Sequence, residues 1–490
     1  MDIKNLQNKK VAILGFGQEG QAVTHYLIKH GIKPVLFDEK PLNKWPSADK
    51  KIVNNLKLKH VLGKNSFKNL LGFDVVFRSP GIPLSHKGLQ SRIKDKGLRI
   101  IISSQTKWFF EHCPAKIIGV TGTKGKGTTA SLIYKILKKN FQISNFPPRA
   151  DLYDKFQIKS KNQNPKTKVY LTGNIGKGQP LDFLDKLKPN DWVVYELSSF
   201  QLQDLNISPH IGVVLMITQE HLDYHKNISE YFNAKEAIVK YQMKNDIAII
   251  NADFSASAKI GELSKGKKIY FSRRKILKQG CFIKNNNVVL SGFGKIGAKL
   301  KFPISKLQLR GEHNLENVCA AAAAAYAANC SLISIKKCLK TFKGLEHRLE
   351  FITEKKGIKY YNDSFSTTPE TAIAAINAFK EPLILILGGS SKKSDFTKLG
   401  QTVAKTKNIK SVILIGKEAG KIKSSILKYK SYKRKFFQGA KSMKDIFFQI
   451  KKTASRGDVV LLSPACASFD MFKNYRDRGE QFKKFAIKNG

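Results

Sequence analysis

A loop rich in glycine, lysine and threonine carries residue types suited to phosphate chemistry. It consists of Gly122, Thr123, Lys124, Gly125, Lys126, Gly127, Thr128 and Thr129. Backbone N–H groups of such a turn can cradle phosphate oxygens, its lysine can reach the β and γ phosphates, and a following hydroxyl can hold Mg²⁺. The standard motif has Ser or Thr directly after the lysine, whereas Gly127 follows Lys126 here. The loop therefore predicts γ-phosphate chemistry, which a kinase or a GTPase would also use, with Thr128 as the Mg²⁺ ligand.

Polar residues further along the chain could complete a metal site beside this loop. Glu196 ends the apolar run 192–195, and a carboxylate that ends a strand next to a phosphate loop can supply a second Mg²⁺ ligand. His221 and Lys235 follow in the sequence. Taken alone, His221 fits a structural histidine and Lys235 fits a solvated helix residue, so residue spacing assigns neither of them to the site.

A second glycine motif lies near the start of the chain. Gly15-Phe16-Gly17-Gln18-Glu19-Gly20 follows an apolar run, and Asp38 comes about 20 residues later, as in a dinucleotide-binding fingerprint. Glycines at such a turn let the backbone approach a diphosphate at a helix N-terminus, and any diphosphate suits that geometry. Three interpretations stay open: NAD, a nucleotide-sugar diphosphate, and a purely structural turn.

Three loops of small polar residues follow apolar runs in the last part of the chain. They span residues 362–369, 388–392 and 463–470. The carboxyl ends of parallel strands lie at one edge of an open α/β sheet, and ligands bind at that edge. The three loops therefore predict a further ligand site.

The elements that must position these residues alternate along the chain. Apolar runs predict strands, and amphipathic or alanine-rich stretches predict helices at 21–29, 128–137, 314–328 and from about Asp470 onward. This rhythm is typical of parallel α/β sheets. A chain of 490 residues is too long for one core, so we predict three domains with boundaries near 114 and 348. The polar stretch 144–167 indicates a surface insertion.

The composition is that of a globular protein with a strong positive charge. Lys and Arg total 87 against 37 Asp and Glu, a net charge of +50. The lysines are spread singly or in pairs, whereas nucleic-acid binding favours a clustered, arginine-containing stripe. We therefore expect anionic substrates and no nucleic acid. Six cysteines without C-x-x-C spacing, the absence of a signal peptide and the absence of an apolar run near ~20 residues predict a cytoplasmic protein without a membrane span.

Taken in order, these motifs resemble the Mur ligase family over nearly the whole chain. The most specific parts are Gly173-Asn174-Ile175-Gly176, Tyr195 to Gln201, Gly311 to Asn314, Gly344 to Glu350 and the run from Ser463 to Gly479. The resemblance implies three α/β domains: a Rossmann-like domain at 1–113 that binds uridine diphosphate (UDP), a phosphate-loop ATPase with a mostly parallel sheet at 114–347, and a Rossmann-like domain at 348–490 that binds an amino acid. Within the family the pattern is similar to the enzyme that adds D-glutamate to UDP-N-acetylmuramoyl-L-alanine in peptidoglycan synthesis.

The resemblance also implies roles for individual residues. UDP would contact Gly17, Gln18, Asp38, Ser79, Pro80 and Gly81, and the muramoyl-alanine part would contact Asn174, Ser198 and Gln201. ATP would contact the loop 122–129 together with Asn317, Arg348 and Asp363. Thr128, Glu196, His221 and Lys235 would hold Mg²⁺, and Lys126, Glu196, His221 and Lys235 would be the catalytic residues. Lys235 would be carbamylated, because an ammonium cannot bind Mg²⁺ and a carbamate offers anionic oxygens. D-Glutamate would contact Thr367, Lys392, Ser468 and Tyr475.

The implied reaction is carried out by a monomer in two steps. The γ-phosphate of ATP passes to the L-alanine carboxylate, and the amino group then displaces phosphate through a tetrahedral intermediate, while Lys126 and Mg²⁺ offset the developing charge. The identity of the amino acid stays open, because Phe365 stands where many members have Lys and Ser390-Ser391 stands where Asp-Gly is common. One alternative is a folylpolyglutamate synthase-type ligase, which lacks the run 463–479. Another is a nucleotide-binding regulator, which would not need Glu196, His221 and Lys235.

Overall fold

The computed structural model describes residues 2–93, 100–143, 167–175, 178–218, 224–225, 227–292, 300–390, 394–429 and 434–489. The chain divides into two compact units. The first unit comprises residues 1–304 and 316–338, and the second comprises residues 305–315 and 339–490. The expected insertion at 144–167 lies outside the described residues except for Thr167. The predicted domain boundaries near 114 and 348 stay predictions.

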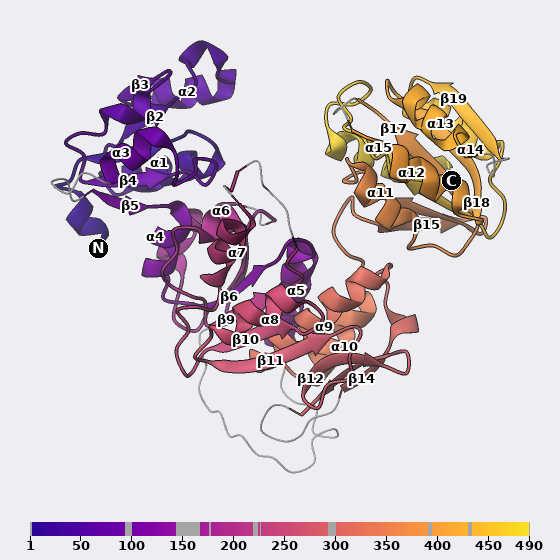
Figure 1. Ribbon diagram of the computed structural model, residues 1–490, viewed down its shortest axis with the longest axis horizontal. Coiled ribbons are helices and arrows are strands. Elements are labelled where there is room, and N and C mark those ends of the chain that lie inside the picture. Colours follow the sequence, from indigo (N-terminus) through magenta and orange to yellow (C-terminus); the bar gives the residue numbers. More distant parts are fainter. Residues whose placement is uncertain are drawn as a thin grey trace. The chain divides into compact units, whose positions relative to one another are not determined.

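The first unit begins with a five-stranded parallel sheet in the order β3-β2-β1-β4-β5 (Figure 1). Its strands are β1 (Val11–Leu14), β2 (Val35–Asp38), β3 (His60–Leu62), β4 (Val75–Arg78) and β5 (Ile101–Ser103), and its helices are α1 (Gln18–Lys29), α2 (Ser47–Asn55), α3 (Lys87–Ile93) and α4 (Gln105–His112). The strand order reverses direction at β1 and β4. The carboxyl ends of these two strands therefore flank the crevice in which such sheets bind ligands.

A nine-stranded sheet forms the rest of the first unit, in the order β14-β13-β12-β11-β10-β9-β6-β8-β7. Its strands are β6 (Lys116–Thr121), β7 (Val169–Gly173), β8 (Trp192–Glu196), β9 (Ile211–Val214), β10 (Ile247–Asn251), β11 (Lys267–Ser272), β12 (Gly280–Lys284), β13 (Asn287–Ser291) and β14 (Leu300–Pro303). Strands β7 to β12 run parallel, and β13 and β14 extend the sheet in antiparallel fashion. Its helices are α5 (Lys126–Ile143), α6 (Ser199–Leu202), α7 (Ile228–Glu236), α8 (Ser255–Glu262), α9 (Glu312–Ala327) and α10 (Leu332–Thr341), except that residues 312–315 of α9 and 339–341 of α10 belong to the second unit.

One hydrophobic cluster joins the two sheets of the first unit. Phe77 of β4 and Trp108 of α4 belong to the same cluster as Ile117 of β6 and Tyr195 of β8. The rings of Phe109 and Tyr195 lie 5.7 Å apart. Because α4 packs against both sheets, the two sheets form one compact unit.

The second unit contains a six-stranded sheet in the order β15-β16-β20-β17-β18-β19, in which only β15 is antiparallel (Figure 1). The strands are β15 (Glu350–Lys355), β16 (Ile358–Asn362), β17 (Leu383–Gly388), β18 (Ile409–Ile415), β19 (Lys435–Ala440) and β20 (Val459–Leu462). The helices are α11 (Pro369–Ile376), α12 (Thr397–Lys405), α13 (Ala419–Leu427), α14 (Met443–Lys451) and α15 (Tyr475–Asn489). Leu385 of β17 faces the cluster with α11 to α13, and Ile384 faces the cluster with α14 and α15. The alternation of strand residues thus builds a three-layer α/β/α arrangement.

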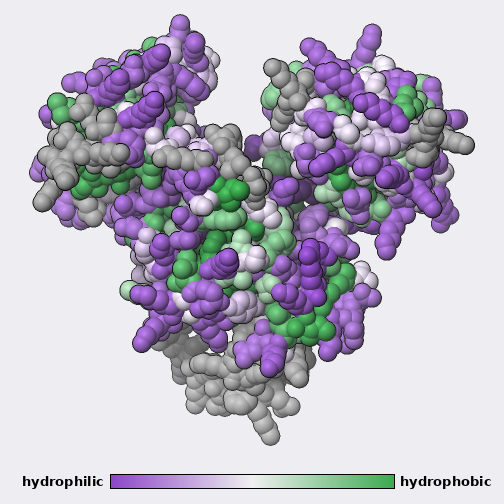
Figure 2. All heavy atoms as spheres, viewed as in Figure 1, coloured by the Kyte–Doolittle hydropathy of each residue, from purple (hydrophilic) through white to green (hydrophobic). Residues whose placement is uncertain are grey.

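The prediction of an α/β fold is confirmed, and two helix boundaries were wrong. The helix expected over 128–137 continues to Ile143, and the closing helix expected from about Asp470 begins at Tyr475. The Asn474 Oδ1 atom accepts hydrogen bonds from the backbone N–H groups of Arg476 and Asp477, at 2.9 and 3.0 Å. This side chain caps the helix and fixes its start. Hydrophilic residues cover most of the surface visible in Figure 2, as the net charge of +50 requires.

Candidate functional site

The phosphate loop connects β6 to α5 and depends on one glycine. Gly125 has a φ of +87°, and a Cβ atom at this position would lie 2.2 Å from the Asn317 Oδ1 atom of α9. Only glycine adopts this backbone conformation without strain, and only glycine leaves room for the amide. Asn317 also accepts a hydrogen bond from the Thr129 hydroxyl at 3.2 Å. The structure therefore places Asn317, predicted to contact ATP, directly against the loop.

Lys126 and the threonines of the loop lie where the sequence places phosphate chemistry. The Lys126 amine donates to the carbonyl oxygens of Gly122 and Thr123, at 2.9 and 3.0 Å, so it folds over the loop. Thr123 is fixed by the Tyr231 hydroxyl and the Thr218 backbone, each at 2.9 Å. Both of these partners belong to the loop itself, so the amine lies at the position where the loop would hold a phosphate oxygen.

Lys235 is buried beside this loop, contrary to its interpretation as a solvated helix residue. It lies on α7 and is 1% exposed. Its Nζ atom is 3.3 Å from the Thr121 hydroxyl and 3.2 Å from the Gly122 carbonyl oxygen, and 4.8 Å from the centre of the Tyr231 ring. The sequence could not show this, because a lysine one residue before the end of a helix is usually solvated. Its position at the base of the loop instead supports the role that the family resemblance implied.

Neighbouring strand ends bring the other predicted residues to the same edge of the sheet. Strands β8 and β7 run parallel to β6, with Val120 opposite Glu196 and Glu196 opposite Gly173. Glu196 is 7% exposed, and Asn174 follows β7 in an exposed turn. Ser198 caps α6 and forms a capping box with Gln201. His221 lies outside the described residues.

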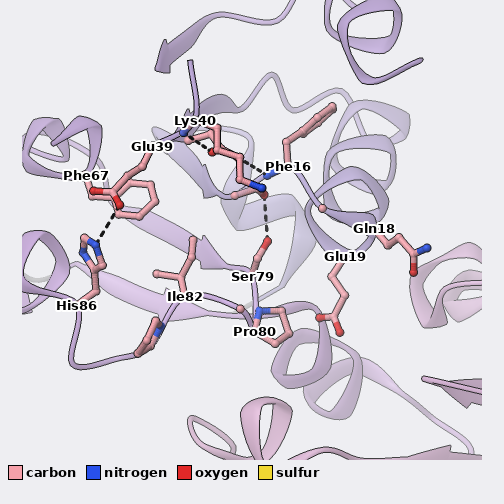
Figure 3. Close-up of a pocket in the computed structure, with 15 residues that line it drawn as sticks. Phe16, Gln18, Glu19, Glu39, Lys40, Phe67, Ser79, Pro80, Ile82 and His86 are labelled. Carbon is pink, nitrogen blue, oxygen red and sulfur yellow. Dashed lines mark hydrogen bonds and ion pairs between the residues drawn. The ribbon is translucent and has the colours of Figure 1, made fainter. Parts of the chain in front are cut away.

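The predicted UDP contacts line one cavity of about 650 Å³ at the carboxyl ends of β1 and β4 (Figure 3). The lining includes Gly17, Gln18, Asp38, Ser79, Pro80 and Gly81. Asp38 accepts hydrogen bonds from the backbone N–H groups of Phe16 and Lys40, at 3.1 and 2.8 Å. The Ser79 hydroxyl donates to the Gly15 carbonyl at 3.0 Å. The fingerprint and the Ser79 loop thus form the two walls of a single cavity.

Two buried contacts connect this cavity to α6 in the nine-stranded part. The Arg78 guanidinium pairs with Asp204 at 2.9 Å, and the two side chains are 0% and 7% exposed. Arg78 also donates to the Ile82 carbonyl oxygen at 2.6 Å and to the Phe200 carbonyl oxygen at 3.3 Å. The Gln201 amide donates to the Glu19 Oε1 atom at 2.8 Å. The wall of the UDP cavity and the residues predicted for the muramoyl-alanine part are therefore held together.

In the second unit, Asp363 is fully enclosed at the end of β16. Its carboxylate accepts hydrogen bonds from the Ser463 hydroxyl at 2.7 Å, from the Leu349 N–H at 3.1 Å and from the Ser366 hydroxyl. Burial raises the pKa of Asp363 to about 6, because desolvation outweighs the hydrogen bonds that favour the ionised form. Two of the three predicted loops thus meet at this carboxyl group.

The remaining predicted residues of the second unit surround these loops. The Arg348 guanidinium lies 4.6 Å from the centre of the Phe365 ring, which is 43% exposed. Ser468 is buried, and the backbone carbonyl of Tyr475 accepts a hydrogen bond from the Ser364 hydroxyl at 2.7 Å. Thr367 follows in the first loop. Lys392 lies outside the described residues.

Sequence reasoning missed several charged residues at the two sites, among them the buried Arg478 and Arg78 and the half-buried Glu19. Arg478 is 0% exposed and donates to Ser364 and to the carbonyl oxygens of Cys466 and Ala467, so it fixes the run 463–470; burial lowers its pKa to about 10. Arg78 resembles an ordinary surface residue in the sequence. Glu19 and Arg478 each carried a signal, because Glu19 belongs to the glycine motif 15–20 and Arg478 belongs to the run 463–479 that supports the resemblance.

No helix in the described part of the chain combines the length and the apolar character that a membrane crossing requires.

Comparison with known proteins identifies three family domains along the chain. The model for the Mur ligase MurD-like, N-terminal domain matches residues 9–102, the Mur ligase middle domain matches residues 120–325, and the Mur ligase, glutamate ligase domain matches residues 347–466. Among solved structures, MurF from Acinetobacter baumannii has a TM-score of 0.57 at 17% identity and covers 100% of this chain and 93% of its own. UDP-N-acetylmuramate-alanine ligase MurC from Thermotoga maritima has a TM-score of 0.56 at 16% identity, covering 98% and 99%. These likenesses show a shared fold.

Curated relatives are similar over nearly the full length. A protein named UDP-N-acetylmuramoylalanine--D-glutamate ligase from Clostridium tetani is 36% identical over 98% of this chain and 97% of its own length. A protein of the same name from Caldanaerobacter subterraneus subsp. tengcongensis is 36% identical over 98% of both chains. With three matching domains and this identity, the chain belongs to the Mur ligase family.

Proposed function

We propose that the protein is an ATP-dependent ligase that joins D-glutamate to UDP-N-acetylmuramoyl-L-alanine in the synthesis of peptidoglycan precursors. The observation that carries the proposal is the phosphate loop with Lys126, which is bounded by Glu196 and the buried Lys235. A relative that bears the name of this ligase matches 98% of the chain. The same matches favour the nucleotide-sugar interpretation of the N-terminal fingerprint over NAD, since the matching domain is a MurD-like one.

The reaction divides between the two units of the chain. The cavity beneath Gly17, Gln18 and Ser79 binds the UDP part, and Ser198 with Gln201 receives the muramoyl-alanine end. The phosphate loop binds ATP, and Lys126 neutralises charge on the γ-phosphate as it moves to the L-alanine carboxylate. The acyl phosphate that results has a good leaving group, so the amino group of D-glutamate can attack it and phosphate departs.

Mg²⁺ is the cofactor that suits the donors present at the loop. The Thr128 hydroxyl, 3% exposed, and the Glu196 carboxylate are hard oxygen ligands of the kind Mg²⁺ takes. The cation supplies charge stabilisation to the phosphates. Lys235 fits the set as a carbamate, because its Nζ atom lies 3.2 Å from the Gly122 carbonyl oxygen, a contact within the loop itself. His221 completes the proposed metal environment.

The second unit supplies the nucleotide and amino-acid contacts. Arg348 and Asp363 complete the ATP site. Thr367, Lys392, Ser468 and Tyr475 form the pocket for D-glutamate, where a cation and hydroxyl groups suit a dicarboxylate. The Phe365 ring packs against the Arg348 guanidinium and helps to hold this cation in place.

The test is phosphate release with UDP-N-acetylmuramoyl-L-alanine, Mg·ATP and a panel of L- and D-amino acids. We expect turnover with D-glutamate above all others, and none with L-glutamate. The Lys126→Ala variant should lose turnover, whereas Lys139→Ala, at an exposed position near the end of the same helix, should match the wild type. Absence of turnover with every amino acid would refute the proposal. Nucleotide binding without turnover would instead indicate a regulator.

A further inference from the structure

Glu19 is a carboxyl group at the edge of the UDP cavity that the proposed reaction does not use. It lies in the first turn of α1, directly after Gln18, and lines the cavity. Figure 3 shows that its side chain extends from α1 toward Pro80, whereas the Gln18 side chain points away from it. An ionised carboxylate here would oppose the two negative charges of a bound diphosphate.

The hydrogen bonds around Glu19 account for one of its two oxygens. Oε1 accepts from the Gln201 amide at 2.8 Å. Oε2 is buried and has no hydrogen-bond partner among the described residues, and the same holds for the Oε1 atom of Gln105. Both residues line one small second cavity beneath Arg78 and Ser79, and the Gln105 amide donates to the Gln179 Oε1 atom at 3.0 Å. A buried acceptor that lacks a donor is costly, and a proton on Glu19 Oε2 would relieve this cost.

A proton on Glu19 makes Oε2 a donor, so this atom is no longer an unsatisfied acceptor. The Gln201 amide still donates to Glu19 Oε1, and the Gln105 amide still donates to Gln179. Burial raises the pKa of Glu19 to about 7, and this desolvation outweighs the Gln201 side chain, the charge of Arg78 and the Gln105 side chain, all of which lower the pKa. The N-terminus of α1 acts in the opposite direction, because its N–H groups favour an ionised carboxylate.

The other charged and titratable groups around Glu19 are already engaged or lie on the cavity rim. Arg78 forms its ion pair with Asp204, and the Tyr195 hydroxyl bonds to the Thr106 hydroxyl at 3.2 Å, while burial raises the Tyr195 pKa far above neutrality. The Tyr224 hydroxyl donates to the Pro80 carbonyl at 2.7 Å. Asp38, Glu39, Lys40 and His86 line the opposite side of the cavity. None of these groups therefore competes with Gln105 for the Glu19 proton.

We propose that Glu19 works as a neutral acid in the nucleotide-sugar cavity, with its proton held between Glu19 Oε2 and Gln105 Oε1, and that loss of this proton weakens the binding of the diphosphate. The inference rests on the proposed UDP-sugar substrate and deepens it. Glu19 thereby acts as a specificity-determining residue that keeps negative charge out of the cavity while it holds Gln201 in place. Its ionised form repels the diphosphate in a low-dielectric setting.

A different arrangement of the amides makes the opposite prediction. If the Gln105 and Gln179 amides were turned over, an ionised Glu19 would accept two N–H groups, one from Gln201 and one from Gln105. Substrate affinity would then be independent of the Glu19 proton. The pH dependence of binding therefore separates the two arrangements.

The experiment measures the Kd of UDP-N-acetylmuramoyl-L-alanine by calorimetry, without ATP, in the full-length protein. For the wild type we expect Kd to rise about fivefold between pH 7 and pH 8, because only the form with a protonated Glu19 binds and the pKa of Glu19 is about 7. Glu19→Gln is a neutral isostere, so it should keep the affinity that the wild type has at about pH 6 and lose the pH dependence. Glu111→Gln, the same change at an exposed position of α4, should follow the wild type.

A spectroscopic measurement checks the proton directly. The infrared difference between the wild type and Glu19→Gln should contain a carboxylic-acid carbonyl band at about pH 6 that disappears at about pH 8. A Kd that is the same at pH 7 and pH 8 in the wild type, or an equal pH dependence in Glu19→Gln, overturns the inference. Absence of binding at every pH, in every variant, overturns the proposed substrate itself.

Discussion

Replacement of Arg78 by methionine should loosen the wall of the UDP cavity. The substitution keeps an unbranched side chain but leaves the Asp204 carboxylate, 7% exposed, without its cation, and it removes the donors to the Ile82 and Phe200 carbonyl oxygens. Removal of one partner of a buried ion pair costs about 3–5 kcal/mol, because the remaining charge stays desolvated. Both residues are enclosed, so solvent screening reduces this figure little.

Hydrogen exchange followed by mass spectrometry measures the effect where it arises. A loss of about 3–5 kcal/mol corresponds to exchange faster by about two to four orders of magnitude, since a tenfold change is about 1.4 kcal/mol. We expect this acceleration in amides of β4, of residues 79–82 and of α6. The Km for UDP-N-acetylmuramoyl-L-alanine should rise together with these exchange rates, while kcat at saturation changes less.

Two further variants make the test specific. Arg78→Met combined with Asp204→Leu removes both charges and should restore much of the protection, as expected for a coupled pair. Lys268→Met breaks the exposed pair with Glu262, whose side chains are 29% and 62% exposed, and should change exchange by less than about tenfold. Acceleration below about tenfold in Arg78→Met, or equal protection in the single and double variants, would refute the reasoning.

Three other predictions follow from the sites described. Gly125→Ala should weaken ATP binding strongly, because the new Cβ would lie 2.2 Å from Asn317 Oδ1 at a φ of +87°; normal ATP affinity in a fluorescence titration would contradict this. Asp363 has a folded pKa of about 6, above its ordinary 3.8, so its contribution to stability is complete below pH 3.8 and is lost as pH rises through 6. At pH 7, Asp363→Asn should therefore unfold at a higher urea concentration than the wild type, with a free energy of unfolding larger by up to about 3 kcal/mol. This advantage should disappear near pH 4, and an equal difference at both pH values would count against the prediction. Lys235→Ala should lose turnover and recover part of it with added short-chain carboxylic acids, whereas undiminished activity without them would exclude an essential carbamate.

Much of the fold followed from local pattern. Short apolar runs such as Val11–Leu14 are buried on both faces, as strands of parallel sheets are, so their apolar composition alone marked them. The glycines of the phosphate loop were equally visible, because their conformation depends on a few neighbouring residues. The start of α15 was less visible, since the Asn474 cap lies among other polar residues that could have served equally well.

The buried charges could not be found in the same way. Arg78 and Asp204 are 126 residues apart in sequence, and their pairing depends on two sheets that share one core. Lys235 reaches the phosphate loop across 113 residues. An isolated charged residue gives the same local signal whether its partner is solvent or a distant side chain. Family resemblance supplied Lys235, because its motif is shared, but it supplied no role for Glu19 or Arg78.

Helix α9 links the interior of the protein to its nucleotide chemistry. Ala320 to Ala325 are all 0% exposed, and Asn317, one turn earlier on the same helix, touches both Gly125 and Thr129. Added methyl groups in this alanine run have no free volume to occupy, so they must shift the helix, and Asn317 moves with it. Mutations in the interior, far from any substrate, would therefore appear as altered ATP affinity. This helix is accordingly a place to obtain temperature-sensitive alleles whose chemistry is intact at low temperature.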